Sequence, residues 1–358
     1  MTAQLRERLA EVRRRTLALV EAVSDQDLHR PLSPIMSPLV WDLAHIAAYE
    51  DLWAVHRLGG VPLLHEDLAA TYDAFETPRA VRGEIELLDR AGALAYLAEV
   101  RARTLEVLDR EDAGELHDLV LRHELQHTET MRQAMFLGGL PPGVGPTDAV
   151  PGEDGWIVVD AGEAAIGAGD DGFAYDNERP RHPVTLNAFR IARRPVTNAT
   201  WLAFAEGGGY RRREWWSDEG WSWKQCYDIT HPEGWMDGPA LDAPVEHVSW
   251  FEADAFARSQ GARLPTEAEW ERAATWDQEP LMGTGRVWEW TSSEFTGYPG
   301  FRAHPYREYS EVFFDRGYRV LRGGSWATAP EVASTTFRNW DLPERRQIFS
   351  GVRLVKEI

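Results

Sequence analysis

The sequence predicts a protein of mixed class, in which a four-helix bundle comes first and an irregular α+β domain follows. Three features predict this: apolar residues at helical spacing before residue 138, a Pro- and Gly-rich segment over 139–155, and short β-prone runs with most of the Trp residues after it. A length of 358 residues also exceeds the usual size of one hydrophobic core. We therefore expect a helical domain over 1–138, a linker over 139–155 and a second domain over 156–358.

Four amphipathic patterns make up the predicted bundle. The first includes Leu5, Leu9, Val12 and Leu19, the second runs over 38–58, the third over 94–108 and the fourth over 116–137. Ser37 and Pro38 provide an N-cap and a first helical residue for the second helix. Pairs of glycines end the second and fourth patterns.

In the second domain, β-prone runs over 156–162, 182–192 and 318–326 predict strands, because they are short and bounded by turn residues. Helical patterns lie near 251–259 and 266–274. An alternation of this kind, without a repeat, is typical of an α+β domain.

The composition excludes several classes of function. Asp and Glu outnumber Lys and Arg by 58 to 38, and the formal net charge is −20, which argues against nucleic acid or an anionic membrane as a partner. No apolar run approaches the roughly 20 residues of a membrane span, and the first residues lack the apolar core of a signal peptide. We expect a cytoplasmic protein. The single cysteine, Cys226, excludes an intrachain disulfide and any chemistry that needs a cysteine pair in one chain.

Histidines interrupt the apolar stripes of two predicted helices. In the fourth helix the inward stripe includes His123 and His127, four residues apart, so both imidazoles project from one face and can bind one metal ion. The second helix adds His45, between Trp41 and Tyr49 on one face. Facing helices of a bundle can bring all three to one centre. Zinc and ferrous iron both suit such a site, because the ligand type alone does not separate them.

A zinc peptidase is the competing interpretation, because residues 123–127 read HELQH and the glutamate of that pattern acts as a general base. The further histidine of the extended zinc-peptidase motif is missing, and His45 already supplies a third ligand upstream. Three other histidines, His56, His65 and His117, lack comparable placement, and we expect them to lie at the surface.

The segments SPIMSPLVWDLAHIAAYEDLW and HELQHTETM resemble the DinB-like domain of the ergothioneine-biosynthesis sulfoxide synthases, the EgtB family. The second half is similar to the formylglycine-generating-enzyme or sulfatase-modifying domain, which has a C-type-lectin-like fold, through AYDNERPRHPV, RRPVTNATW, PVEHVSW, RLPTEAEWE, VWEWTSS, RVLRGGSWA and FRNWDLPERRQIFSGVRL. Formylglycine generation itself needs a cysteine pair, so that activity is excluded here. We expect RGGSW, LPTEAEWE and GVRL to hold the fold.

The resemblance implies an enzyme that uses Fe(II) and O₂ to join a thiol donor to C2 of the imidazole of hercynine, a trimethylated histidine. It implies that His45, His123 and His127 bind the iron and that Gln126 contacts hercynine. The following roles come from the same resemblance: a catalytic tyrosine, Tyr306; pocket residues for hercynine, Tyr309, Asn339 and Trp340; and residues for the donor, Asp341, Arg79 and Arg82. The pocket is then expected between the two domains.

The chain departs from the family in its loops. The connection over 272–287 and the region 225–241 are shorter than in the family members that it resembles. Shorter loops can alter the pocket for the donor, so the resemblance defines the donor less well than it defines the iron site or hercynine. The paired arginines favour a carboxylate-rich thiol such as γ-glutamylcysteine. Selenoneine synthase, a close relative that uses a selenosugar with hercynine, stays open as the alternative.

Overall fold

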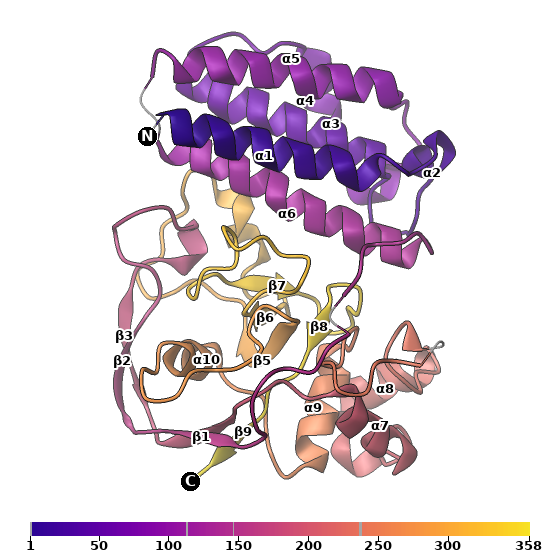
Figure 1. Cartoon of the computed structure of the whole chain (residues 1–358), viewed down its shortest axis with the longest axis vertical. Helices are drawn as coiled ribbons and strands as arrows, with labels where there is room; N and C mark the ends of the chain where they lie inside the picture. Colours follow the sequence, from indigo (N-terminus) through magenta and orange to yellow (C-terminus); the bar gives the residue numbers. More distant parts are fainter. Residues whose placement is uncertain (1, 112–113, 146, 236–237) are drawn as a thin grey trace. The chain divides into compact units, whose positions relative to one another are not determined.

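The computed structural model describes residues 2–111, 114–145, 147–235 and 238–358. The chain divides into two compact units, Met1–Val144 and Gly145–Ile358, which are drawn in indigo to magenta and in magenta to yellow in Figure 1. The division falls inside the segment 139–155 that we expected to be a linker. Position 146 of that segment, and positions 236 and 237 of the short region 225–241, lie outside the described residues.

The first unit is helical, and its long helices lie side by side in Figure 1. Its elements are α1 (Thr2–Val20), α2 (Asp25–His29), α3 (Leu39–Glu50), the π-helical continuation η1 (Asp51–Leu58), α4 (Glu66–Thr71), η2 (Arg79–Val81), α5 (Arg90–Leu108) and α6 (Glu115–Leu137). The four predicted patterns are thus confirmed as α1, α3 with η1, α5 and α6. One detail was wrong: α3 begins after Pro38, which occupies the N-cap position, and the Ser37 hydroxyl instead accepts a hydrogen bond from a guanidinium.

The helix α3 lies at the centre of the bundle and packs on α5 and α6. Its sequence, LVWDLAHIAAYE, is apolar on nearly every side, and all of its residues except Tyr49 are buried. A helix with apolar residues all round is stable only inside a core. The polar side chains that α3 carries, Asp42 and His45 among them, are therefore held in fixed positions by the surrounding side chains.

A buried charge cluster joins four helix surfaces in the core of the bundle. The carboxylate of Glu124 accepts from Arg13 Nε at 2.8 Å and from Arg101 Nη2 at 2.8 Å, and the carboxylate of Glu50 accepts from the same two arginines at 3.0 and 2.6 Å. Two positive and two negative groups balance one another, as buried charges require. The cluster fixes the direction in which Glu124 leaves α6.

The second unit combines short helices with three small sheets. Its helices are α7 (Asn198–Glu206), α8 (Asp218–Cys226), α9 (Trp250–Ser259), α10 (Glu267–Ala274) and the 3₁₀ turns η3 (Asp176–Glu178), η4 (Arg213–Trp215), η6 (Arg307–Tyr309) and η7 (Glu311–Phe313). Its strands are β1 (Trp156–Val159), β2 (Gly162–Ile166), β3 (His182–Leu186), β4 (Phe189–Ala192), β5 (Trp288–Glu294), β6 (Arg319–Arg322), β7 (Asn339–Asp341), β8 (Ser350–Gly351) and β9 (Val355–Glu357). The predicted strands and both predicted helices are present, whereas α7 and α8 were not predicted.

The sheets have the orders β1-β4-β9, β2-β3 and β7-β6-β5-β8. All described pairings are antiparallel except that of β5 with β8. The last strand, β9, pairs with β4 near the start of the unit, so the two ends of this unit share one sheet. Ile157, Val159, Phe189 and Ile191 turn their side chains into the core beneath that sheet.

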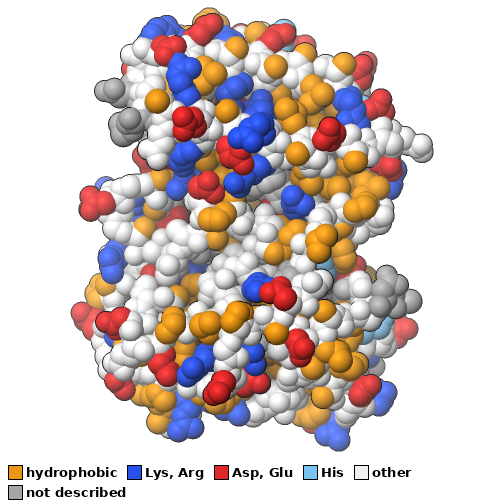
Figure 2. Space-filling view, in the orientation of Figure 1, with side chains coloured by type: hydrophobic (Ala, Val, Ile, Leu, Met, Phe, Trp, Pro, Cys, Tyr) orange, Lys and Arg blue, Asp and Glu red, His pale blue; other side chains and the backbone are white. Residues whose placement is uncertain are grey.

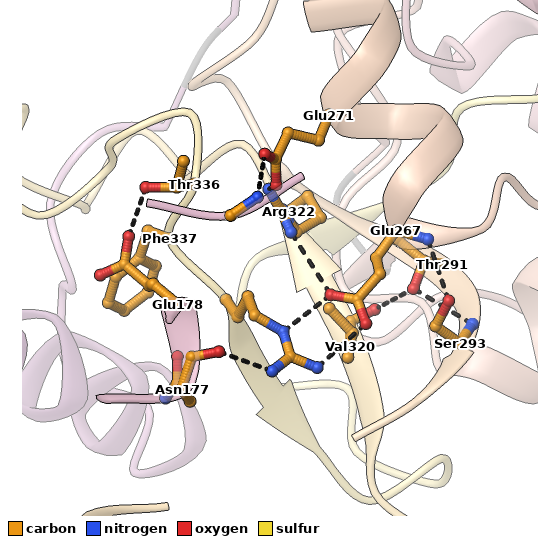
Figure 3. A network of polar contacts seen from close by, with 12 residues as sticks. Asn177, Glu178, Glu267, Glu271, Thr291, Ser293, Val320, Arg322, Thr336 and Phe337 are labelled. Carbon is orange, nitrogen blue, oxygen red and sulfur yellow. Dashed lines mark hydrogen bonds and ion pairs between the residues drawn. The ribbon is translucent and has the colours of Figure 1, made fainter. Parts of the chain in front are cut away.

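Fully buried arginines, each paired with a carboxylate, hold the second unit together. Arg322 contacts Glu271 at 2.5 Å, as Figure 3 shows. The guanidinium of Arg338 contacts Glu267 at 2.7 and 2.9 Å. Arg353 makes the same kind of contact with a buried glutamate of β5. The residues of these pairs come from RVLRGGSW, LPTEAEWE, VWEWTSS, FRNWD and GVRL. Buried guanidinium–carboxylate pairs of this kind account for several of the motifs by packing alone.

The surface shown in Figure 2 carries basic and acidic side chains interspersed over both units, the distribution of an ordinary solvated surface. Among the described residues, none of the helices combines the length and the apolar character that crossing a bilayer requires.

Candidate metal centre

Three histidines of the bundle converge. His45 comes from α3, and His123 and His127 come from successive turns of α6, which packs on α3. One ligand nitrogen from each lies within 4.8 Å of the others, and the Nε2 atoms of His45 and His123 are 3.2 Å apart. Two nitrogen ligands about 2.1 Å from one ion are separated by about 3.0 Å at a right angle and by about 3.4 Å at a tetrahedral angle. The observed separation falls between these values.

The far side of two of the rings is held by an acceptor. The Nδ1 atom of His45 donates to the carbonyl of Tyr72 at 2.6 Å, and that of His127 lies 3.1 Å from Oδ1 of Asp42. A proton held on Nδ1 leaves Nε2 as the atom with a free lone pair, which is the arrangement found behind metal-bound histidines. Asp42 was not predicted as a site residue, although it stands one turn before His45 in an otherwise apolar helix.

Aromatic rings stack on the imidazoles of His45 and His123. Trp41 stacks on His45 with ring centroids 4.7 Å apart, and Tyr49 stacks on His123 at 3.6 Å and an interplanar angle of 7°. The guanidinium of Arg82 covers the Trp41 ring at 3.6 Å from its centroid. The imidazoles therefore have little freedom to rotate away from the shared centre.

Burial sets the protonation state of the site. It holds the pKa of His45 well below its ordinary value, and the neighbouring His127 lowers it further. Burial likewise holds the pKa of His123 well below the ordinary value, with His127 and His45 adding to the effect. Neutral imidazole is the form that binds a metal ion. The Nδ1 atom of His123 is a buried polar atom without a hydrogen-bond partner in the described structure. The three-nitrogen donor set, the lowered pKa values of His45 and His123, and the separation of those two Nε2 atoms fit one metal ion.

The peptidase interpretation of HELQH is wrong for this chain. Both carboxylate oxygens of Glu124 are bound by the arginines of the charge cluster, and Oε1 also accepts from the Thr16 hydroxyl at 2.7 Å. Glu124 is buried in the core of the bundle. A general base must reach a water molecule on the metal, and this carboxylate is engaged by other groups.

The expected donor residues of the first unit differ in their surroundings. Arg79 is exposed and donates to the carbonyl of Ile35 at 3.2 Å. Arg82 is buried, and its guanidinium donates to Thr77 O at 2.8 Å, to the Ser37 hydroxyl at 2.9 Å and to Ala74 O at 3.0 Å. Burial lowers the pKa of Arg82 to about 10. These contacts, with the stacking on Trp41, are those of a residue that supports the histidine site.

Two further predictions concern α6. Gln126 is half-buried on the turn between the two metal-site histidines, where the resemblance placed a hercynine contact. His117 was expected at the surface, and this was wrong, because it is fully buried at the start of α6 and its Nδ1 accepts from the Gly114 N–H at 3.3 Å. The spacing of apolar residues does not show that a histidine will be buried through a contact with the backbone at the start of its own helix. His56 and His65 are exposed as expected.

The predicted site residues of the second unit form an aromatic cluster of their own. The ring of Tyr309 meets Tyr306 edge-on at 6.2 Å and Trp340 edge-on at 5.8 Å, and Trp340 stacks on Phe295 at 4.2 Å. All three predicted aromatic residues are half-buried. The structure thus brings Tyr306 and Tyr309, from η6 and its N-cap, beside β7.

The polar members of the cluster stand on β7. Asn339 Oδ1 accepts from the backbone N–H of Trp340 at 3.0 Å. Asp341 accepts from the N–H of Leu342 at 2.8 Å and from Gln347 Nε2 at 3.2 Å, and Arg345 lies 3.8 Å away. The prediction that one pocket between the domains joins this cluster to the three histidines stays a prediction.

Comparison with known proteins assigns both units to families. Residues 8–138 match the DinB superfamily, and residues 143–279 and 282–358 match the sulfatase-modifying factor enzyme 1-like domain. The fold class predicted from the sequence, a helical DinB-like region followed by a sheet-containing domain of this second family, is confirmed. The second match is interrupted at 280–281, inside the connection 272–287 that we found short.

Full-length relatives are similar across both units. The chain is 42% identical to hercynine oxygenase of Mycolicibacterium thermoresistibile over 429 aligned positions, which cover 99% of this chain and 95% of the relative. It is 41% identical to hercynine oxygenase of Mycobacterium tuberculosis, with 99% of each chain covered. Ergothioneine biosynthesis protein 1 of Schizosaccharomyces pombe is 28% identical over 51% of this chain and 28% of its own length. The alignment with the Mycolicibacterium thermoresistibile protein has 429 positions, more than the 358 residues of this chain, so this chain has gaps in that alignment. The chain belongs to the hercynine oxygenase family.

Proposed function

We propose that this protein is a sulfoxide synthase of ergothioneine biosynthesis, which uses Fe(II) and O₂ to join a thiol donor to C2 of the hercynine imidazole. The observation that carries the proposal is the cluster of three histidines in a chain that matches hercynine oxygenases over both units. In the overall reaction a C–H and an S–H bond are lost and a C–S bond forms. One oxygen atom of O₂ becomes the sulfoxide oxygen and the other leaves as water.

The donor set supports this choice of metal chemistry. Three neutral imidazoles leave an ion its full charge and open positions for further ligands. Bound Fe(II) would supply the activation of O₂ and the deprotonation of the donor thiol. His45, His123 and His127 would hold it, with Asp42 and the Tyr72 carbonyl keeping two of the rings in the required tautomer.

The substrate residues follow from the chemistry of hercynine. Its trimethylammonium group is a permanent cation, which prefers aromatic faces, and Tyr309 and Trp340 provide such faces beside each other. Gln126 and Asn339 carry amides that can accept from or donate to the remaining polar groups of hercynine. The hydroxyl of Tyr306 would donate a proton during C–S bond formation and so keep the oxidant from simply oxidising the donor sulfur.

The donor that we propose is γ-glutamylcysteine. Arg79 is exposed and therefore accessible to one of its carboxylates, and Asp341 would pair with its ammonium group. The role that we propose for Arg82 is to support Trp41, which in turn stacks on His45. A selenosugar has hydroxyls in place of this zwitterion and would not depend on Arg79.

The test is mass spectrometry of products after incubation with Fe(II), O₂, hercynine and a panel of donors. The panel contains γ-glutamylcysteine, cysteine and a selenosugar. The proposal expects a hercynine–γ-glutamylcysteine sulfoxide, formed only with both metal and O₂ present. Efficient use of the selenosugar, with poor use of γ-glutamylcysteine, would replace the thiol donor by a selenium donor and leave the histidine site unaffected.

A further inference from the structure

The segment 304–310 of the second unit carries both Tyr306 and Tyr309 but belongs to no sheet. It contains only the short turn η6, whose backbone closes through Ser310 N–H donating to Arg307 O. Three-residue 3₁₀ turns of this kind have few internal hydrogen bonds. The position of the two tyrosines must therefore be set by contacts from elsewhere in the unit.

One carboxylate contacts the segment at both of its ends. Asp176 Oδ1 accepts from the Ser310 hydroxyl at 2.6 Å, and Asp176 Oδ2 accepts from the His304 backbone N–H at 3.3 Å. Asp176 and Ser310 are both buried, so water does not compete for the contact between them, whereas His304 lies at the exposed end of the segment. The two donors flank the tyrosines on either side along the chain.

The residue before Asp176 contacts the segment through its ring. Tyr175 stacks on Tyr309 with centroids 4.5 Å apart and an interplanar angle of 8°, and Phe337 meets Tyr175 edge-on at 5.5 Å. Tyr309 in turn meets Tyr306 edge-on. A hydrogen-bonded contact and a stacked contact from adjacent residues thus hold the same short segment.

The turn that supplies these contacts is itself firmly held. Glu178 accepts from the Tyr175 backbone N–H at 2.8 Å and from the Thr336 hydroxyl, and the carbonyl of Asn177 accepts from Arg338 at 2.7 Å. Figure 3 shows Asn177, Glu178, Thr336 and the buried ion pairs around them. Because η3 is fixed to the core by these bonds, it can act as a rigid support for the segment 304–310, which has few hydrogen bonds within itself.

We infer that Asp176 is a positioning residue, which clamps both ends of the segment 304–310 and thereby places the hydroxyl of Tyr306 for the oxygen-dependent step. The inference rests on the role proposed above for Tyr306. It assigns no contact with substrate to Asp176. It also gives a structural purpose to AYDNERPRHPV, the segment that contains Asp176.

The electrostatics of Asp176 make the clamp sensitive to pH. Burial raises the pKa of Asp176 to about 6, although the bonds from Ser310 and from backbone N–H groups and the facing imidazole of His304 oppose that rise. The other charged groups nearby, Glu178 on the same turn and Arg338 against Asn177, have partners of their own. Below about pH 6 a proton on one carboxyl oxygen turns that oxygen into a donor, and one of the two clamp contacts is lost.

The ionised carboxylate of Asp176 holds the segment 304–310 in place, but it lowers the free energy of unfolding. A raised pKa means that the folded state binds this proton more tightly than the unfolded chain does. The ionised carboxylate therefore lowers stability at neutral pH, and Asp176→Asn should leave the melting temperature unchanged or raise it. A residue kept for packing alone would show the reverse when it is replaced.

The experiment compares Asp176→Asn and Ser310→Ala with a control, Ser334→Ala. Ser334 also donates a hydroxyl to a buried carboxylate, Glu178 Oε2 at 3.3 Å, but that oxygen keeps its bond from Thr336. Hydrogen–deuterium exchange of the peptide covering 304–310 reports the clamp without any assay of activity. The ratio of sulfoxide formed to O₂ consumed reports the placement of Tyr306.

In both clamp variants the backbone amide hydrogens of the 304–310 peptide should exchange at least several-fold faster than in the wild type. In the control variant their exchange rate should stay the same as in the wild type. The coupling ratio should fall several-fold in Asp176→Asn with the hercynine Michaelis constant within about two-fold. In the wild type the ratio should fall below about pH 6, and in Asp176→Asn it should not vary there. Unchanged exchange in both variants, or faster exchange with unchanged coupling, overturns the inference. If Tyr306→Phe itself leaves coupling unchanged, the proposed role of Tyr306 has failed, and the exchange result still decides whether Asp176 holds the segment.

Discussion

Replacing Asp42 by asparagine should weaken metal binding without disrupting the bundle. The carboxylate lies 3.1 Å from His127 Nδ1 and is only 1% exposed, so solvent does not screen the contact. An amide at this position carries no charge and can present its own N–H toward the imidazole, which would disfavour the tautomer with Nε2 free. Loss of an outer partner of a metal-bound histidine typically costs ten- to a hundred-fold in affinity. This corresponds to about 1.4–2.7 kcal/mol.

The measurement is an anaerobic competition titration of Fe(II) against a chromophoric chelator. Asp51→Asn is the matched control, because Asp51 is also a fully buried carboxylate on the same helical run but accepts from the Leu64 N–H and Arg103 instead of a histidine. We expect the control to lose thermal stability and to keep its affinity for the metal. A dissociation constant for Asp42→Asn within two-fold of the wild type would refute the role of Asp42.

The remaining predictions concern other residues of the two units. Glu124→Ala should destabilise the protein by about 3–5 kcal/mol in denaturant unfolding, because it leaves two buried guanidinium groups unbalanced; normal stability would contradict the charge cluster. Tyr306→Phe should keep hercynine binding within a few-fold but shift O₂ consumption from sulfoxide to oxidised donor; if only Tyr309→Phe does so, the two tyrosines have exchanged roles. Arg79→Met should raise the Michaelis constant for γ-glutamylcysteine about ten- to a hundred-fold with that for hercynine unchanged, since a charge-assisted contact contributes about 1.5–3 kcal/mol. Arg82→Met should instead lower the melting temperature, and an effect confined to the donor would restore Arg82 to the donor site.

Periodicity was a reliable guide to the bundle and to its histidines. The patterns behind α3 and α6 are long, so their faces can be read from spacing, and the i, i+4 pair His123 and His127 follows directly. The helices α7 and α8 have nine residues each and were missed, although α9 and α10 are about as short and were predicted. The helices α9 and α10 each open with a capping box, whereas α7 and α8 open with a single N-cap hydroxyl, which is a weaker signal in the sequence. The error at Pro38 is one residue, within the uncertainty of any helix boundary.

Contacts between distant parts of the chain could not be predicted from local sequence. The resemblance implied that Arg82 holds the donor, and nothing in the sequence around Arg82 indicates Trp41, on which it stacks. Asp176 lies 134 residues from Ser310, and no local pattern links the two. Asp42 is different, since a lone carboxylate one turn before His45 in an apolar helix was visible in the sequence and indicates a partner for a buried polar group.

We propose that the three-histidine centre of this chain supports oxygen-dependent C–S bond formation on hercynine. The most direct test is a single incubation with Fe(II), hercynine and γ-glutamylcysteine under ¹⁸O₂, followed by mass spectrometry, with His123→Ala alongside. We expect the wild type, and not the variant, to form a sulfoxide that contains both substrates and one ¹⁸O atom. A wild type that forms no such adduct and only oxidises the donor, or an adduct formed equally by His123→Ala, would contradict the proposal.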